Sequence, residues 1–409
     1  MRRQRSNDAP LGRPRSGRLG VPLLVLAVMA LVAAACGSDG SDSEGGSGTT
    51  AATEIGKGEG SLDIIAWAGY AEDGSSDPAY DWVTPFEEQS GCETNVKIGN
   101  TSDEMVQLMQ SGNYDGVSAS GNASQRLIAA GDVAEINTDL IDTYGDIAEF
   151  LKDQTSNSAD GKVYGIPHGW GANLLQWNTE VVTPAPDSWS VVYDEDSPSA
   201  GKITAYDDWT TIADAAVYLM SSQPDLGITN PYALDQDQFD AAVALLEQQK
   251  PLIGEYWSDY LKYEEAVTKG SIVLGTTWQI ITNTLQAAEP PVPVDAVLPK
   301  EGSTAWSDNW MISSEAKHPN CMYEWINYIT SPGPQAQVAE YFGEAPANLK
   351  ACDETTDPTH CDTYGANDPD FYQQLWFWVV PTTTCLDGRT DVECVGFKDW
   401  VTAWTEIKG

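Results

Sequence analysis

From residue 61 onward, short apolar segments of strand length alternate with segments of helix length, and this alternation constrains the fold more than any other feature. "SLDIIAW" (61–67), "YDGVSAS" (114–120) and "KITAYDD" (202–208) have the length and composition of buried strands. Helix-like stretches such as 101–112 and 209–220 lie between them. Strands that alternate with helices predict an α/β fold with mixed, mostly parallel sheets. The chain has 409 residues, enough for two or more hydrophobic cores.

Three polar or aromatic residues follow the ends of predicted strands. In open α/β sheets, ligands bind beyond the carboxyl ends of the strands. Trp67, Ser120 and Trp278 each lie at or just past such an end. The pattern therefore makes these three residues candidates for a ligand site.

The first 35 residues have the features of a secretory signal. They contain six arginines and one acid, and the apolar run "VPLLVLAVMALVAAAC" (21–36) ends in small residues before a cysteine. The run is too short and wrongly flanked for a transmembrane helix. "LVAAAC" resembles a bacterial lipobox, which predicts that Cys36 is lipidated and anchors the chain to the extracytoplasmic face of the cell membrane; plain secretion is the alternative. Residues 36–60, rich in Gly, Ser and Thr, are expected to form a flexible tether.

The net charge is strongly negative and becomes more so without the signal. Removing residues 1–35 lowers Lys+Arg from 21 to 15 and Asp+Glu from 61 to 60, so the net charge changes from −40 to −45. Such a surface repels nucleic acid and anionic lipid headgroups and attracts cations. We therefore expect no nucleic-acid partner.

The cysteines indicate an oxidising compartment, because six of the seven remain after Cys36 is set aside. The simplest pairing joins the two pairs that are nine residues apart and leaves one long-range pair, although six cysteines allow fifteen connectivities. The favoured bridges are Cys352–Cys361, Cys385–Cys394 and Cys92–Cys321. The chain has no C-x-x-C and only three scattered histidines, so no metal site is predicted. We expect His168 to be a hydrogen-bonded structural histidine.

One segment, "STAWSDNWMIS" (303–313), places Asp308 between Trp306 and Trp310. Two interpretations compete. In a helix, the two indoles would face the core and Asp308 would face water. In a binding site, the indole faces and the carboxylate would form a cage that shares the charge of an organic cation.

The order of these segments resembles the extracellular solute-binding proteins of ABC importers, and most closely their spermidine/putrescine-binding branch. The resemblance covers roughly residues 61–350 and rests on "IIAWAGY", "GNYDGVSAS", "YGIPHGWG", "KITAYDD", "VLGTTW" and "VDAVLPKEGSTAWSDNWMIS". It implies a two-lobe periplasmic-binding-protein-like fold with crossing hinge strands that closes on its ligand. Lobe one would comprise 61–172 and 307–350, and lobe two 173–306 and 351–409.

The resemblance also implies a polyamine site. Its positions carry over onto Trp67, Tyr70, Ser120, Asp208, Trp278, Trp306 and Asp308. Three positions depart from the family pattern: Asn122 and Glu344 stand where an aromatic residue is usual, and Thr211 stands where a second carboxylate follows Asp208. One acid is thus lost, and Glu344 is included among the candidate ligand-binding residues because it supplies another. Asp208 can also cap a helix that starts at Trp209.

The implied function is a monomeric, lipid-anchored receptor that delivers a polyamine to an ABC permease and its ATPase, with no cofactor and no catalysis. A polyamine is a multiply charged rod near pH 7, so its methylenes favour indole walls and its ammonium groups favour carboxylates. One alternative is the same receptor for a sugar or a quaternary amine. The other is a secreted glycosidase with Asp207, Asp208 and Asp308 as candidate acids, although no common hydrolase or nucleotide-binding motif is present.

Overall fold

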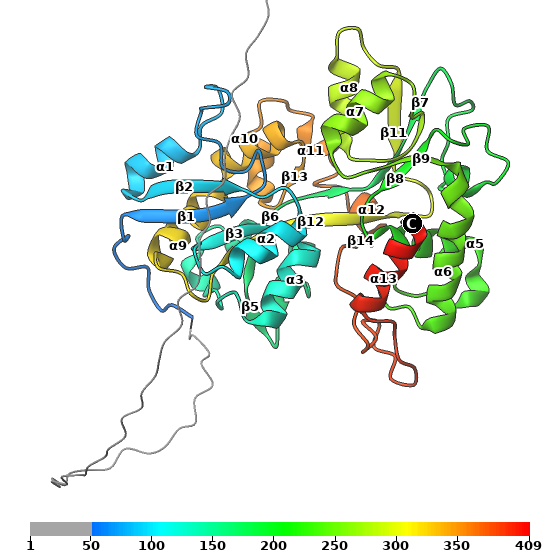
Figure 1. Ribbon diagram of the computed structural model, residues 1–409. Helices are drawn as coiled ribbons and strands as arrows, with labels where there is room; N and C mark the ends of the chain where they lie inside the picture. Colours follow the sequence, from blue (N-terminus) through cyan, green and yellow to red (C-terminus); the bar gives the residue numbers. More distant parts are fainter. Residues whose placement is uncertain (1–50) are drawn as a thin grey trace, which may run out of the picture. The chain divides into compact units, whose positions relative to one another are not determined.

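The computed structural model describes residues 51–409 (Figure 1). The signal sequence (1–35), Cys36 and most of the proposed tether lie outside the described residues. Within 51–409, no helix combines the length and the apolar character needed to cross a membrane. The described residues form one compact unit with two principal β-sheets.

The first sheet has seven strands in the order β13-β6-β12-β3-β1-β2, with β14 paired to β12. The strands are β1 (Ser61–Ala66), β2 (Glu93–Ile98), β3 (Gly116–Ser120), β6 (Gly165–Ala172), β12 (Ser303–Ile312), β13 (Ala345–Pro346) and β14 (Leu375–Phe377). β1 runs parallel to β2 and β3, whereas β12 is antiparallel to both β3 and β6. All ten residues of β12 are buried, because the strand is paired on both sides.

The second sheet has five strands in the order β11-β7-β10-β8-β9. The strands are β7 (Leu174–Asn178), β8 (Ile203–Tyr206), β9 (Ile253–Trp257), β10 (Leu274–Thr277) and β11 (Val294–Val297). β8 is parallel to β9 and β10, and β7 is antiparallel to β10 and β11. Both sheets are therefore mixed, as the α/β pattern predicts, although parallel pairings do not outnumber antiparallel ones in either sheet.

Most helices lie between strands in the chain, and some of them start at a side-chain N-cap. They are α1 (Val83–Ser90), α2 (Ser102–Met109), α3 (Gly121–Ala130), α4 (Ser190–Tyr193), α5 (Thr211–Ser222), α6 (Gln236–Gln249), α7 (Tyr260–Thr268), α8 (Gln279–Ala287), α9 (Pro319–Ile329), α10 (Pro332–Phe342), α11 (His360–Thr363), α12 (Pro369–Tyr372) and α13 (Phe397–Lys408). Thr101 caps α2 by accepting a hydrogen bond from the Glu104 backbone N–H. Asp235 and Gln238 form a reciprocal capping box at α6.

Two crossings connect the sheets, and hydrogen bonds hold them together. The first crossing is Asn173, the single residue between β6 and β7, and the second leads from β11 into β12. The Asn173 backbone N–H donates to the Thr304 carbonyl at 3.0 Å, and its side-chain amide donates to Thr304 Oγ1 at 2.6 Å. Ser303 Oγ donates to the Asn173 carbonyl. The two crossings are thus hydrogen-bonded to each other where Asn173 meets the start of β12.

The hydrophobic core is divided between the sheets, and the C-terminal tail contributes to both parts. Tyr364 and Leu375 pack in a cluster with residues of the first sheet, whereas Trp400 and Trp404 of α13 pack with residues of the second. We propose the two lobes with the boundaries given above, except that the tail is shared between them instead of belonging to lobe two alone.

The three disulfides have the connectivity that the sequence favours. Cys92–Cys321, Cys352–Cys361 and Cys385–Cys394 are all formed. Residues 51–60, expected to be part of a flexible tether, instead contact α9 and the core. The Glu59 carboxylate accepts hydrogen bonds from the Asn320 and Cys321 backbone N–H groups, and Ile55 packs against the first core cluster. The proposed tether therefore ends before residue 51.

Candidate functional site

β12 settles the two interpretations of "STAWSDNWMIS", because the segment is a strand and not a helix. Side chains two apart share one face of a strand, so Trp306, Asp308 and Trp310 lie on the same face. Asp308 is 2% exposed and does not face water. The cost of burying this carboxylate requires partners within the fold.

The strands beside Asp308 leave room above the sheet. Ser120 of β3 is opposite Asp308 on one side, and Gly169 of β6 is opposite it on the other. A Cβ atom at Gly169 would lie 2.0 Å from the Glu344 carboxyl carbon, and a Cβ atom at Gly171 would lie 2.6 Å from the Trp306 ring. The two glycines of "HGWG" thus make space for the Glu344 carboxyl and the Trp306 indole.

The Tyr70 hydroxyl lies between the buried carboxyl groups of Asp308 and Glu344. Its hydroxyl oxygen lies 2.8 Å from Asp308 Oδ2 and 2.6 Å from Glu344 Oε2. Tyr70 and Glu344 are fully buried. Tyr70 comes from the loop after β1, Asp308 from β12 and Glu344 from the residue before β13, so three separate segments supply the cluster.

Several polar atoms of the cluster have no hydrogen-bond partner within the described residues. Asp308 Oδ1 and Glu344 Oε1 are buried and unpartnered, and so are both ring nitrogens of His168. The His168 Nε2 atom is 3.8 Å from Glu344 Oε1, which is too long for a hydrogen bond. The expectation of a hydrogen-bonded structural His168 is therefore wrong. Buried acceptors without donors are costly, and they are the natural partners of a cationic donor.

Burial governs the protonation of these groups. It raises the pKa of Asp308 to about 6, and the hydroxyl groups of Ser120 and Tyr70 oppose this shift, Tyr70 through its hydrogen bond to Oδ2. Burial and the nearby Asp308 charge hold the pKa of Glu344 well above its usual range. Burial alone lowers the pKa of His168 to about 3, so the imidazole is neutral near pH 7. His168 therefore supplies no positive charge to the unpartnered oxygens of Asp308 and Glu344.

A continuous series of aromatic rings leads from this cluster to the second sheet. Tyr70 lies 4.5 Å from Phe342, Phe342 lies 5.8 Å from Trp306, and Trp306 lies 6.4 Å from Trp278, measured between ring centroids. Tyr206, at the end of β8, is 5.6 Å from Trp278 and stacks on Trp378 at 5.7 Å. Trp278 follows β10, and its indole N–H donates to Asn173 Oδ1 at the crossing. The rings thus span both sheets.

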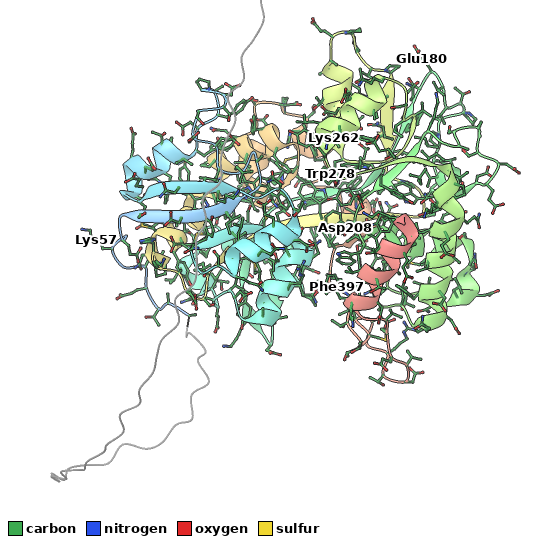
Figure 2. All side chains as sticks on the ribbon, in the orientation of Figure 1. Lys57, Glu180, Asp208, Lys262, Trp278 and Phe397 are labelled. Carbon is green, nitrogen blue, oxygen red and sulfur yellow. A yellow bond between two sulfur atoms is a disulfide. The ribbon has the colours of Figure 1, made fainter. Side chains whose placement is uncertain are left out.

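Asp208 lies at the second-sheet end of this series, after β8 (Figure 2). Burial raises the pKa of Tyr206, and the charges of Asp208, Asp207 and Asp308 raise it further. Asp208 Oδ1 accepts a hydrogen bond from the Thr210 backbone N–H, just before α5 begins at Thr211. Burial raises the pKa of Asp208 to about 6. Because α5 begins at Thr211 and not at Trp209, Asp208 stabilises the turn before the helix and does not cap it as expected.

The three departures from the family pattern have different outcomes. Thr211 is buried and donates from Oγ1 to the Tyr206 carbonyl, so the second acid of the family pattern is absent from this position. Asn122 is buried and accepts hydrogen bonds from Ser102 and Ala123 at the start of α3. Glu344 joins the Asp308 cluster. Relative to the family pattern, an acid is thus absent at position 211, beside the second sheet, and present at position 344, beside the first.

Trp67 is the candidate that the structure does not bring into the cluster. Its indole is partly buried, packs beside β1 and has an unpartnered Nε1. It makes no ring contact with the aromatic series. The residues that the sequence did not indicate are Phe342 and Tyr206, which complete the series, and His168. Trp378 is buried and stacks on Tyr206.

A cavity of about 330 Å³ adjoins the two indoles. Trp278 and Trp306 line it together with Tyr364 and Phe371 of the tail, and Asp208, Asp308 and Glu344 do not. This volume is at the lower end of the range for ligand pockets. The cavity thus reaches the aromatic walls and stops short of the carboxyl groups.

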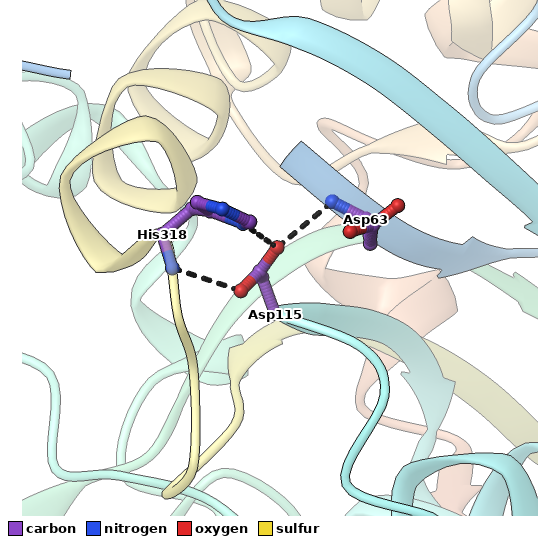
Figure 3. Close-up of side chains that lie close together, drawn as sticks. All are labelled: Asp63, Asp115 and His318. Carbon is purple, nitrogen blue, oxygen red and sulfur yellow. Dashed lines mark hydrogen bonds and ion pairs between the residues drawn. The ribbon is translucent and has the colours of Figure 1, made fainter. Parts of the chain in front are cut away.

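A second acidic group, Asp63, Asp115 and His318, has the proximity of metal ligands (Figure 3). Asp115 Oδ1 accepts from the backbone N–H groups of Lys317 and His318, and Oδ2 accepts from the Asp63 N–H and contacts His318 Nδ1 at 2.8 Å. Because both carboxylate oxygens are engaged, a metal would have to displace these bonds. The group has a structural role in tying β1 and β3 to the start of α9.

Comparisons with known proteins identify the family of the chain. The chain is 25% identical to the putrescine/cadaverine-binding protein of Pseudomonas aeruginosa over 67% of this chain and 77% of that protein. It is 24% identical to the spermidine/putrescine-binding periplasmic protein of Escherichia coli over 71% of this chain and 83% of that protein.

Two solved structures have a similar fold. One is a spermidine/putrescine ABC transporter substrate-binding protein of Streptococcus pneumoniae, with TM-score 0.66, 19% identity, and coverage of 85% of this chain and 97% of that chain. The other is a lipoprotein of Treponema pallidum, with TM-score 0.67, 18% identity, and coverage of 85% and 99%. They confirm the two-lobe α/β fold.

Residues 81–363 match the family described as bacterial extracellular solute-binding protein. The chain therefore belongs to the bacterial extracellular solute-binding proteins, a family of receptors and not of enzymes.

Proposed function

We propose that this protein is the polyamine receptor of an ABC importer and binds a ligand such as putrescine or spermidine between its two sheets. The observation that carries the proposal is the pair of buried, unpartnered carboxyl oxygens, Asp308 Oδ1 and Glu344 Oε1, at one end of an aromatic series. Among residues 51–409, no lysine or arginine forms an ion pair with Asp208, Asp308 or Glu344. A cationic ligand would provide the missing donors.

Each group has a role that follows from its chemistry. One terminal ammonium group would donate to Asp308 and Glu344 through charge-assisted hydrogen bonds. The methylenes would lie against Trp306 and Trp278. An ammonium group over an indole face would add a cation–π contact of about 1–2 kcal/mol when desolvated. Asp208 would hold the other end of the ligand. Ser120 would donate to Asp308. Trp67, outside the aromatic series, would contact the ligand only after the sheets move.

The cavity supports a ligand position beside the two indoles, and access to the carboxyl groups requires the sheets to separate. Two-lobe receptors open and close about their crossing strands. Here those strands meet at Asn173, which also accepts the Trp278 indole N–H. Closing would thus bring the Trp278 wall against the ligand and present a continuous surface to the permease. We further propose that Cys36 carries the lipid that keeps this monomeric receptor at the membrane.

Isothermal titration calorimetry of the purified mature chain tests the ligand. Putrescine and spermidine should bind, whereas a neutral sugar of similar size should not, because it leaves the carboxyl charges unpaired. Choline tests the quaternary-amine alternative, since it has no N–H donors for Asp308 and Glu344. Binding of a sugar without binding of either polyamine would refute the assignment, and tighter binding of choline than of putrescine would replace it.

A further inference from the structure

The hydrogen-bond geometry at Tyr70 requires a proton that the tyrosine itself does not supply. Two carboxyl oxygens, one from Asp308 and one from Glu344, lie within 2.8 Å of the Tyr70 oxygen. A hydroxyl group has one hydrogen and can donate to only one of them. If both carboxyl groups were ionised, one of these short contacts would bring two oxygens together without a hydrogen between them.

A single added proton satisfies both contacts. With Glu344 protonated, its carboxyl O–H donates to the Tyr70 oxygen, and the Tyr70 O–H donates to the Asp308 carboxylate. Two neighbouring carboxyl groups that share a site in this way keep one proton because they cannot both ionise. Burial and the Asp308 charge, which raise the pKa of Glu344, assign the proton to Glu344.

We propose that a cationic ligand replaces this shared proton, so that binding releases one proton from the Asp308–Tyr70–Glu344 cluster to the solvent. The inference rests on the proposed function and adds a proton to its binding equilibrium. The empty site, with one carboxylate and one carboxylic acid, takes up one ammonium group and becomes two carboxylates around that ammonium, and the displaced proton goes to water. The net charge of the cluster with its ligand remains −1.

The groups that surround the cluster favour this exchange. An ammonium between the carboxyl groups neutralises the Asp308 charge and attracts a second negative charge, and both effects lower the pKa of Glu344. His168 faces Glu344 from β6 at 3.8 Å, and burial lowers its pKa to about 3, so it does not accept the released proton. Tyr364 faces Glu344 from the end of α11, and its pKa is raised to about 12, chiefly by burial.

Proton release has a clear signature in calorimetry. At one pH, the binding enthalpy of putrescine is measured in buffers with different ionisation enthalpies, such as phosphate and Tris, and the slope gives the number of protons released. We expect close to one proton per ligand at a pH between 7 and 8, where Asp308 is ionised in the empty site, and an affinity that rises by up to about tenfold per pH unit over that window.

Glu344→Gln is the decisive variant, because glutamine keeps the shape of the side chain and cannot ionise. Its proton release should fall to nearly zero. Its affinity should equal that of the wild type at low pH, where Glu344 is protonated, and should fall behind by up to about tenfold per pH unit as the pH rises. Glu247→Gln, at an exposed position of α6, is the matched control and should leave both quantities unchanged.

The possible results separate the inference from the proposed function. Putrescine binding without proton release at pH 6, 7 and 8 overturns the inference and leaves the receptor assignment intact. Equal release by the wild type and Glu344→Gln also overturns it. Failure of both putrescine and spermidine to bind overturns the proposed function and the inference together. The wild-type measurement needs no variant, so a folding defect in Glu344→Gln does not prevent the test.

Discussion

Replacing Asp308 by asparagine should stabilise the empty protein and weaken the liganded one. The wild-type carboxylate is 2% exposed, and burial raises its pKa from 3.8 to about 6. Each pH unit corresponds to about 1.4 kcal/mol, so keeping Asp308 ionised at pH 7 costs the folded state on the order of 3 kcal/mol. Asparagine removes this charge and can still accept the Tyr70 hydrogen bond.

The pH dependence gives the sign of the effect. Because the folded-state pKa of Asp308 is raised, the side chain does not penalise folding below pH 3.8, and the penalty grows as the pH rises through about 6. The free energies of unfolding of the wild type and Asp308→Asn should therefore converge near pH 4 and differ by about 3 kcal/mol at pH 7. Urea denaturation of the ligand-free proteins at both pH values measures the difference.

Ligand binding should change in the opposite direction. Removing one partner of a buried, hydrogen-bonded charge pair costs about 2–5 kcal/mol, which is roughly 30-fold to several thousandfold in putrescine affinity. Asp225→Asn, at an exposed position, is the control and should alter neither quantity. A less stable Asp308→Asn protein with unchanged putrescine affinity would refute the reasoning, because Asp308 would then be a structural acid.

Two further predictions follow from local geometry. Gly169→Ala places a Cβ atom 2.0 Å from the Glu344 carboxyl carbon, so it should weaken putrescine binding and lower stability by about 1–3 kcal/mol; Gly145→Ala, with open space around its Cβ, is the control in both calorimetry and urea denaturation. Replacing Cys92 and Cys321 by alanine opens a loop with a sequence separation of 229. The lost loop-closure entropy should lower the free energy of unfolding by about 5 kcal/mol, roughly twice the effect of opening either nine-residue bridge. Equal denaturation midpoints for the double variant and the wild type would contradict this value.

Local patterns were sufficient for most of the fold. Strand-length apolar runs and helix caps depend on neighbouring residues, and the Thr101 cap and the strand at 61–67 lie where the sequence indicates. The segment 303–313 was ambiguous for a physical reason. Trp306 and Trp310 are four apart, which fits one face of a helix, and Trp306, Asp308 and Trp310 are also two apart, which fits one face of a strand. Only pairing with β3 and β6 decides between them.

The candidate site was predictable where it follows strand ends and not where it depends on distant packing. Asp308 and Trp278 belong to segments with a family resemblance. Phe342 has no local signal, because its role arises from its distances to Tyr70 and Trp306, more than 200 residues away in one case. The unpartnered His168 is also a tertiary property, since sequence shows a histidine and not the donors around it. Likewise, composition alone placed residues 51–60 in a tether, although Glu59 finds partners on α9.

The position of the acids indicates how recognition is divided between the sheets. Asp308, Glu344 and Tyr70 all come from segments of the seven-stranded sheet, whereas Trp278 and Asp208 come from the five-stranded sheet. We propose that, with an acid at 344 and none at 211, recognition of the ligand charge comes mainly from the seven-stranded sheet and forms while the sheets are still apart. The ammonium group can therefore be paired first, and the Trp278 wall then adds contacts as the crossing strands move. A Trp278→Leu variant should accordingly lose affinity mainly through faster dissociation, because the charge pairing that precedes closure remains intact; stopped-flow fluorescence showing a slower association rate and an unchanged dissociation rate would contradict this order.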